Sequence, residues 1–190
     1  MYDIKNVNKR GDMSKFIFLD RDGTIIRDQI QGFTSTIKDI EFLPKAIQGL
    51  GEMQSLEYKL LIVTNQAGIS KKYYTEEAVR VFHEEIVRQL GNLKISVEKI
   101  YYCPHHPDIT GECECRKPNP GMVHQAVRDF GLDPSQAIFI GDKDCDIELG
   151  RQFGAKTILI SNGQYEVKAI PTAVAKDLME AAKIIADWQS

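Results

Sequence analysis

The chain has 190 residues, a length that fits one domain, and its 43% hydrophobic and 27% charged residues are typical of a globular protein. This balance excludes a disordered tail and a fibrous repeat. The net charge of −3 excludes a general electrostatic attraction to nucleic acid or anionic lipid. The longest aliphatic run, Leu60–Val63, is too short to span a membrane, and Met1–Asp12 lacks the apolar segment of a signal peptide. We therefore expect a cytoplasmic protein with no membrane or nucleic-acid partner.

Strand-like and helix-like segments alternate from Lys15 onward, and the pattern predicts an open, mostly parallel, Rossmann-like α/β sheet with helices on both faces. Residues 15–190 are expected to form this single domain. Residues 1–14 are expected to be a loose leader, with Met1 and Met13 both open as the natural start. In chain order, the expected elements are a strand over Lys15–Asp20, a helix over Pro44–Leu56, a strand over Lys59–Thr64, a helix with Thr75 as N-cap, a strand over Glu98–Tyr102, a helix from Asn119 and Pro120 to Gly131, a strand over Ala137–Gly141, a helix over Asp144–Phe153, a strand over Lys156–Ile160 and a helix over Val174–Trp188.

Polar residues follow several predicted strands, at the sheet edge where open α/β proteins bind ligands. The first strand runs into Asp20-Arg21-Asp22-Gly23-Thr24, the second into Thr64-Asn65-Gln66, and the fourth into Gly141-Asp142-Lys143. Each segment alone is compatible with an ordinary turn. Together they place two carboxylate clusters, a hydroxyl and a glycine-bearing turn on one edge. Because Mg²⁺ prefers oxygen ligands of this kind, the sequence predicts a site for magnesium and phosphate.

The two aspartates after the first strand suit covalent phosphoryl transfer. Asp20 is predicted to be the nucleophile that forms an aspartyl-phosphate, and Asp22 to protonate the leaving alcohol and later activate water. Asp20 and Asp142 are expected to hold Mg²⁺, which offsets the repulsion between a carboxylate and a phosphate. Thr64 and neighbouring backbone N–H groups are expected to hold the phosphoryl oxygens, with a lysine supplying positive charge.

Three of the four cysteines, Cys103, Cys113 and Cys115, lie close together in the sequence beside His105. In a cytoplasmic chain such crowding indicates a metal rather than disulfides. Four protein ligands leave no open position, so the metal is predicted to be a structural zinc ion that fixes a short polar loop. His106 is the alternative nitrogen ligand, and His105 is favoured because its spacing from Cys103 mirrors that of Cys113 and Cys115. Independent free thiols are the other interpretation.

Two basic residues, Arg116 and Lys117, directly follow the last proposed zinc ligand. The zinc loop is expected to direct them toward the carboxylates, where the lysine would provide electrostatic stabilisation and the arginine would bind phosphate in a bidentate manner. A solvated basic pair is the alternative. Cys145 lies outside the cluster and is expected to be a small buried residue. His83 and His124 have no predicted role.

Four segments together resemble the haloacid dehalogenase (HAD) superfamily of phosphatases: FLDRDGT, TNQAGIS, CPHHP with CECRKPNPGM, and GDKDCD. They occur in the family's order and span Phe16 to Ser161. The zinc loop beside Arg-Lys-Pro is similar, more narrowly, to the branch of the D-glycero-D-manno-heptose 1,7-bisphosphate and histidinol-phosphate phosphatases. The resemblance implies a HAD-like fold with a minimal cap and a zinc-pinned loop, Mg²⁺ as the catalytic cofactor and Zn²⁺ as a structural one.

The resemblance also implies roles for individual residues. Catalysis falls to Asp20 and Asp22. Magnesium is expected at Asp20, the backbone carbonyl of Asp22, and Asp142, with Lys143 beside it. Zinc is expected at Cys103, His105, Cys113 and Cys115. Contacts to the substrate or the phosphoryl group are expected from Arg21, Asp28, Thr64, Asn65, Gln66, Arg116, Lys117 and Lys143. The segment Arg27–Thr36 is expected to face the far end of the substrate.

The implied substrate is a small phosphorylated molecule, and the predicted reaction removes the 7-phosphate of D-glycero-D-manno-heptose 1,7-bisphosphate. Histidinol phosphate is the alternative, because the loop from His106 to Glu112 is short and Gly32-Phe33 stands where heptose enzymes more often carry Gly-Tyr. A receiver-like regulatory domain and a zinc-stabilised binding module are the non-enzymatic alternatives. Asp22 argues against the receiver, since a second carboxylate hastens hydrolysis of the phospho-aspartate. A monomer is expected, because the chain has no heptad pattern.

Overall fold

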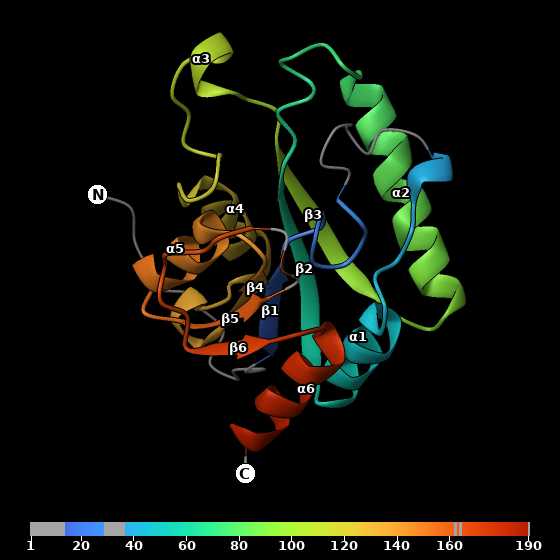
Figure 1. Ribbon diagram of the computed structural model, residues 1–190, viewed down its shortest axis with the longest axis vertical. Helices are drawn as coiled ribbons and strands as arrows, with labels where there is room; N and C mark the ends of the chain where they lie inside the picture. Colours follow the sequence, from blue (N-terminus) through green and yellow to red (C-terminus); the bar gives the residue numbers. More distant parts are fainter. Residues whose placement is uncertain (1–13, 29–36, 162, 164, 190) are drawn as a thin grey trace.

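The computed structural model describes residues 14–28, 37–161, 163 and 165–189, and the predicted leader lies almost entirely outside them. Six strands form one parallel sheet in the order β3-β2-β1-β4-β5-β6 (Figure 1). The strands are β1 (Lys15–Leu19), β2 (Tyr58–Asn65), β3 (Val97–Cys103), β4 (Ile138–Gly141), β5 (Lys156–Ile160) and β6 (Ala173–Ala175). The predicted parallel α/β sheet is confirmed. Its strand order reverses between β1 and β4, where such sheets bind ligands.

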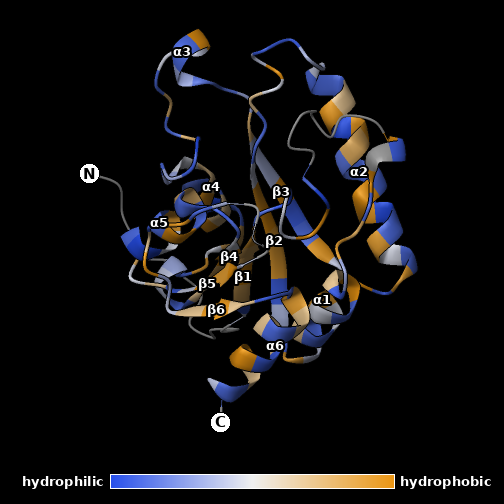
Figure 2. Cartoon of the chain, in the orientation of Figure 1, coloured by the Kyte–Doolittle hydropathy of each residue, from blue (hydrophilic) through white to orange (hydrophobic). Residues whose placement is uncertain are grey.

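Helices cover both faces of this sheet. They are α1 (Ala46–Ser55), α2 (Glu76–Asn92), α3 (Pro107–Thr110), α4 (Gly121–Phe130), α5 (Asp144–Gln152) and α6 (Leu178–Asp187), with 3₁₀ turns at Ile37–Asp39 and Pro134–Gln136. One core layer joins the sheet to α1, α2 and α6, and the other joins it to α4 and α5. In Figure 2 the hydrophobic residues gather along the central strands. No helix among the described residues has the length and apolar character needed to cross a membrane.

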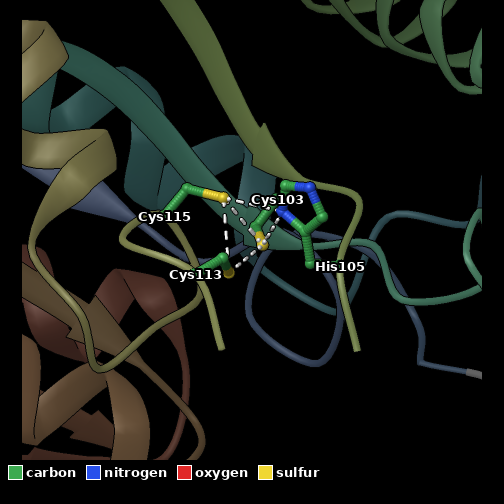
Figure 3. Close-up of side chains that lie close together, drawn as sticks. All are labelled: Cys103, His105, Cys113 and Cys115. Atoms are coloured by element: carbon green, nitrogen blue, oxygen red, sulfur yellow. Dashed lines mark hydrogen bonds between the residues drawn. The ribbon is translucent and has the colours of Figure 1, made fainter. Parts of the chain in front are cut away.

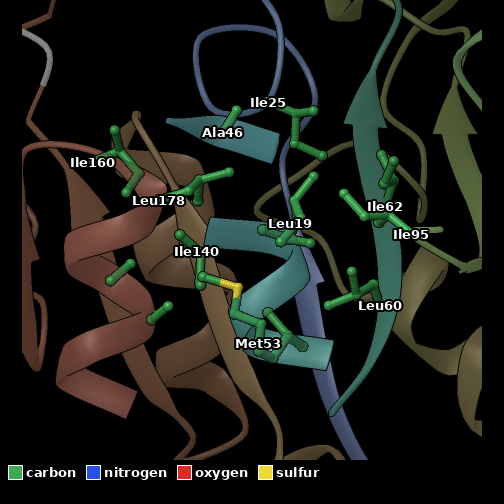
Figure 4. Close-up of a cluster of buried hydrophobic side chains, with 14 of the residues drawn as sticks. Leu19, Ile25, Ala46, Met53, Leu60, Ile62, Ile95, Ile140, Ile160 and Leu178 are labelled. Carbon is green, nitrogen blue, oxygen red and sulfur yellow. The ribbon is translucent and has the colours of Figure 1, made fainter. Parts of the chain in front are cut away.

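Strand β1 is buried on both faces because it lies in the middle of the sheet. Its alternate side chains enter different layers, Phe16 and Phe18 on one face and Ile17 and Leu19 on the other. Phe18 stacks on Phe139 of β4 with ring centroids 4.7 Å apart. Figure 4 shows Leu19 in the opposite layer, among side chains from α1, β2 and α6. Full burial of each such side chain contributes about 1.5–3 kcal/mol, so the end of β1 is firmly positioned.

Local capping signals set several helix ends as predicted. Thr75 is the N-cap of α2, where its hydroxyl accepts a hydrogen bond from the Ala78 N–H at 3.1 Å. Gly131 ends α4 with a φ of 65°, a left-handed conformation that glycine adopts readily.

The prediction of a last helix over Val174–Trp188 is wrong at its start. Ala173–Ala175 instead forms β6, which pairs in parallel with β5 at the edge of the sheet. Helix α6 begins at Leu178, after Asp177 accepts a hydrogen bond from the Glu180 N–H at 2.9 Å. Aspartate is a favoured N-cap residue, so Asp177 favours a helix that begins directly after it over one that begins at Val174. Helix α3 was also absent from the prediction.

Candidate active site

Asp20 directly follows β1, at the switch point of the sheet. Its N–H donates to the Ile140 carbonyl of β4 at 2.9 Å, and its Oδ1 accepts hydrogen bonds from the Arg21 N–H and from Lys117 Nζ, each at 2.8 Å. Burial opposes ionisation of this carboxyl, but the charges of Lys117 and Lys143 outweigh it, and the pKa of Asp20 lies below its ordinary value. Asp20 is therefore an oriented, ionised carboxylate.

Two further buried aspartates face Asp20. Asp142 follows β4 and Asp146 lies in the first turn of α5, and one oxygen from each of the three carboxylates lies within 4.8 Å of the others. Burial, followed by the charge of Asp20, raises the pKa of Asp142 to about 8. Burial also raises the pKa of Asp146 to about 6, although Lys117 works against the shift. Together with the ionised Asp20, these two carboxyl groups form an oxygen donor set that suits a hard cation such as Mg²⁺.

Asp146 is a site residue that the sequence reasoning missed. It stands four residues after Asp142, so one helical turn returns its side chain to the same edge of the sheet. The segment GDKDCD carried that spacing, which was a usable signal. Gly23 allows this cluster to form, because a Cβ at Gly23 would lie 2.1 Å from Asp142 Oδ2. Its φ of +86° also favours glycine.

Lys117 reaches the carboxylates from the loop before α4. Its buried Nζ donates to Asp146 Oδ1 at 2.6 Å and to the Val63 carbonyl at 2.7 Å, in addition to Asp20. Burial opposes its charge, but the two aspartates raise the pKa of Lys117 above its ordinary value. Asn65 holds the same residue by its backbone, since Asn65 Oδ1 accepts from the Lys117 N–H at 3.0 Å and Asn65 Nδ2 donates to the Lys117 carbonyl at 3.1 Å.

Asp22, two residues after Asp20, accepts hydrogen bonds from Arg21 beside it and from Gln66 after β2. The Arg21 guanidinium donates to both of its oxygens, Nε to Oδ1 at 3.0 Å and Nη2 to Oδ2 at 2.8 Å. Gln66 Nε2 also donates to Asp22 Oδ2 at 2.8 Å and to Thr64 Oγ1 at 2.9 Å, while the Tyr74 hydroxyl donates to Gln66 Oε1 at 2.7 Å. Burial raises the pKa of Asp22 despite the charge of Arg21. Two carboxyls with pKa values shifted in opposite directions suit a nucleophile and a general acid.

Lys143 and Asp28 lie together at the rim of the site. Lys143 Nζ donates to Asp28 Oδ2 at 2.9 Å, and the Tyr165 hydroxyl donates to the same oxygen at 2.8 Å. An ammonium group has no lone pair, so Lys143 can act beside a metal ion only as a neighbouring charge. Arg27 is exposed and pairs with Glu41. Residues 29–36 of the predicted substrate-facing segment lie outside the described residues.

A second cluster joins Cys103, at the end of β3, with His105, Cys113 and Cys115 (Figure 3). Their sulfur atoms are 3.0–3.7 Å apart, and His105 Nδ1 lies 3.2 Å from the Cys115 sulfur. Ligands around a tetrahedral zinc ion would be about 3.8 Å apart, so these four atoms have the number, chemistry and approximate spacing of a structural zinc site. His106 instead caps α3 by accepting from the Asp108 N–H.

The neighbours of this cluster are arranged differently from the prediction in two places. Arg116 Nη1 donates to the His105 carbonyl at 3.1 Å, whereas it is the Lys117 side chain that pairs with the carboxylates of Asp20 and Asp146. Cys145, in the first turn of α5, does lie outside the cluster but is half-buried rather than fully buried.

Comparison with known proteins agrees with this geometry. A family model described as HAD-hydrolase-like matches residues 114–181. The D-glycero-beta-D-manno-heptose-1,7-bisphosphate 7-phosphatase of Pasteurella multocida is 38% identical over 159 residues, covering 80% of this chain and 84% of that protein. The D-glycero-alpha-D-manno-heptose-1,7-bisphosphate 7-phosphatase of Photorhabdus laumondii is 33% identical over 178 residues, covering 90% and 96%.

A solved structure extends the likeness to the fold. The D,D-heptose 1,7-bisphosphate phosphatase from B. bronchiseptica, complexed with magnesium and phosphate, superimposes with a TM-score of 0.80 at 26% identity. The match covers 92% of this chain and 99% of that one. The resemblance drawn from the motifs is thereby confirmed. The chain belongs to the HAD-like phosphatases, in the branch of the D-glycero-D-manno-heptose 1,7-bisphosphate 7-phosphatases.

Proposed function

We propose that this protein removes the 7-phosphate of D-glycero-D-manno-heptose 1,7-bisphosphate through an aspartyl-phosphate on Asp20, with Mg²⁺ as cofactor. The observation that carries the mechanism is the contrast between two aspartates on one loop. Asp20 is held ionised by Lys117, whereas burial favours the protonated form of Asp22. The relatives described above act on heptose bisphosphate, which supports this substrate.

In the first half of the reaction, a carboxylate oxygen of Asp20 attacks phosphorus while the bond between phosphorus and the sugar oxygen breaks. The electron pair of that bond goes to the sugar oxygen, and Asp22 supplies its proton. In the second half, Asp22 accepts a proton from water as the water oxygen attacks phosphorus. The bond from phosphorus to Asp20 breaks, inorganic phosphate leaves and both aspartates return to their starting forms.

The carboxylates of Asp20, Asp142 and Asp146, with the backbone carbonyl of Asp22, would hold Mg²⁺. When bound, the ion supplies positive charge that offsets the repulsion between Asp20 and the phosphate. Lys117 adds a buried positive charge beside Asp20 and Asp146. Thr64 Oγ1 accepts a hydrogen bond from Gln66 Nε2 at the end of β2, and this position is suited to binding the phosphoryl oxygens.

Zinc is proposed at Cys103, His105, Cys113 and Cys115, where it would fix the loop that presents Lys117. The four protein ligands leave no open position, so this ion has no proposed part in the chemistry. Arg116 is proposed to contact the substrate or its phosphoryl group. We further propose that residues 15–190 act as one domain and that the protein works as a monomer in the cytoplasm on a small phosphorylated substrate.

The direct test is Mg²⁺-dependent phosphate release from both anomers of heptose 1,7-bisphosphate and from histidinol phosphate. Asp20→Asn is the inactive variant, and Asp129→Asn, an exposed aspartate of α4 paired with Lys99, is the matched control. Release from a heptose anomer that only Asp20→Asn abolishes would support the proposal. Release from histidinol phosphate alone would retain the mechanism and change the substrate. A stable phosphate on Asp20 without release would favour the receiver-like alternative.

A further inference from the structure

His83 has no part in the reaction proposed above, yet it lies at the buried end of a chain of contacts that reaches Asp22. Arg21 Nη1 and His83 Nε2 are 2.8 Å apart. A guanidinium can only donate, so Nε2 must accept and the ring proton must lie on Nδ1. Burial and the charge of Arg21 lower the pKa of His83 to about 3, which keeps the ring neutral and its acceptor available.

The Arg21 guanidinium therefore has a fixed partner on each side. Two of its nitrogens donate to the two oxygens of Asp22, and the third donates to His83. Its carbon lies 4.8 Å from the centre of the Phe82 ring, and the whole side chain is only 1% exposed. Phe82 and His83 are consecutive residues of α2, so this helix holds the arginine while the arginine holds the aspartate.

We infer that His83 is a positioning residue for proton transfer, because by accepting the Arg21 N–H it sets the plane of the guanidinium and thereby the direction of the Asp22 carboxylate. This inference rests on the proposed function, in which Asp22 gives and takes the proton. The competing explanation is that His83 only fills space, since its ring also packs edge-on against Tyr102 with centroids 5.6 Å apart.

Two substitutions separate these explanations. His83→Phe keeps an aromatic ring of similar size but removes the acceptor. His83→Gln loses the ring but offers Oε1, which is as many bonds from Cβ as Nε2 is in histidine. His124→Phe is the matched control, because His124 lies on α4 and packs edge-on against Phe153, away from Asp22.

Each variant is assayed with two leaving groups. The sugar alkoxide of heptose bisphosphate must be protonated as it leaves, whereas 2,4-dinitrophenolate leaves as a stable anion. A positioned acid or base contributes about 10²–10⁴-fold, and misplacement by 1 Å costs about 10²-fold. Because Gln66 still holds Asp22, we expect His83→Phe to lower kcat for heptose bisphosphate by about 10- to 100-fold.

With 2,4-dinitrophenyl phosphate, we expect His83→Phe to release the first equivalent of dinitrophenolate at the wild-type rate. The following steady state should be slow, because the aspartyl-phosphate then waits for Asp22 to activate water. His83→Gln should recover most of the lost activity on heptose bisphosphate. The burst amplitude counts folded active sites, so a partly unfolded variant does not imitate the result. If His83→Phe does not fold, His83→Leu, which also lacks an acceptor, replaces it.

The inference is overturned if the acceptor-free variant behaves like wild type with both substrates, or if its burst slows as much as its turnover of heptose bisphosphate. It is also overturned if His83→Gln is no better than the acceptor-free variant. Failure of the proposed function looks different, since it appears as an absence of phosphate release by the wild-type protein and by His124→Phe.

Discussion

Replacing Lys117 with methionine would remove a buried charge while retaining most of the length of the side chain. Its Nζ lies within 2.8 Å of Asp20 Oδ1, Asp146 Oδ1 and the Val63 carbonyl oxygen. Removing one partner of a buried ion pair destabilises a protein by about 3–5 kcal/mol, because the remaining charge is left without compensation. Two carboxylates would be left in this way. We therefore expect the free energy of unfolding to fall by about 3–5 kcal/mol at pH 7.

The loss should depend on pH with a definite sign. In the wild-type protein the pKa of Asp20 lies below that of an unfolded chain, so its pairing stabilises the fold above about pH 4 and is lost as the pH falls through the folded pKa. In Lys117→Met the carboxylates lack their cation and take up protons at higher pH, which relieves the penalty. The difference between variant and wild type should therefore shrink from pH 7 to pH 4.

Urea unfolding followed by circular dichroism, without added Mg²⁺, measures both effects. Lys143→Met is the matched control, because the Lys143 side chain is 32% exposed and its ammonium pairs with Asp28 at the rim, where an ion pair contributes up to about 1 kcal/mol. A loss below about 1 kcal/mol for Lys117→Met at pH 7 would refute the reasoning. So would an equal loss at pH 4 and pH 7.

Three further outcomes follow from the two metal clusters. Cys113→Ser should lower both the melting temperature, measured by calorimetry, and the zinc content, measured by elemental analysis, whereas the control Cys145→Ser should keep its zinc. Full zinc content and full activity in Cys113→Ser would contradict the assigned ligands. Gly23→Ala should weaken Mg²⁺-dependent turnover, since the new Cβ would lie 2.1 Å from Asp142 Oδ2, whereas Gly51→Ala, where a Cβ meets nothing within 4 Å, should not. Because the pKa of Asp142 is raised to about 8, protons should compete with Mg²⁺ for this carboxylate below that pH. The affinity of the protein for Mg²⁺, measured by calorimetry, should therefore fall about tenfold for each unit by which the pH is lowered. A flat profile between pH 6 and pH 8 would contradict this competition.

Much of the fold could be predicted because buried parallel strands consist of short runs of apolar residues. Each of the first five strands was located to within one residue at either end. Strand β6 was not, because three residues at a sheet edge carry no hydrophobic pattern and Val174 is 55% exposed. Its strand conformation depends on pairing with β5, and a pairing with a distant segment cannot be predicted from the local sequence.

The convergence of Asp20, Thr64 and Asp142 could also be predicted, since residues after neighbouring parallel strands must meet at one edge. The direction of each side chain could not. Lys117 turns to the carboxylates while the adjacent Arg116 turns back to the zinc loop, and the two residue types gave no sign of that difference. The contact between Arg21 and His83 joins residues 62 positions apart on different elements, which no local pattern reveals.

The position of β1 in the sheet also has a consequence for biosynthesis. Strand β1 pairs on one side with β2 and on the other with β4, and Asp142, which follows β4, is translated more than a hundred residues after Asp20. Lys117, which holds the charge of Asp20, is made in between. A nascent chain that ends before β4 exposes one edge of β1 and has no carboxylate cluster. Prematurely terminated chains of this kind therefore lack the carboxylate cluster, which forms only once β4 and the first turn of α5 have been made.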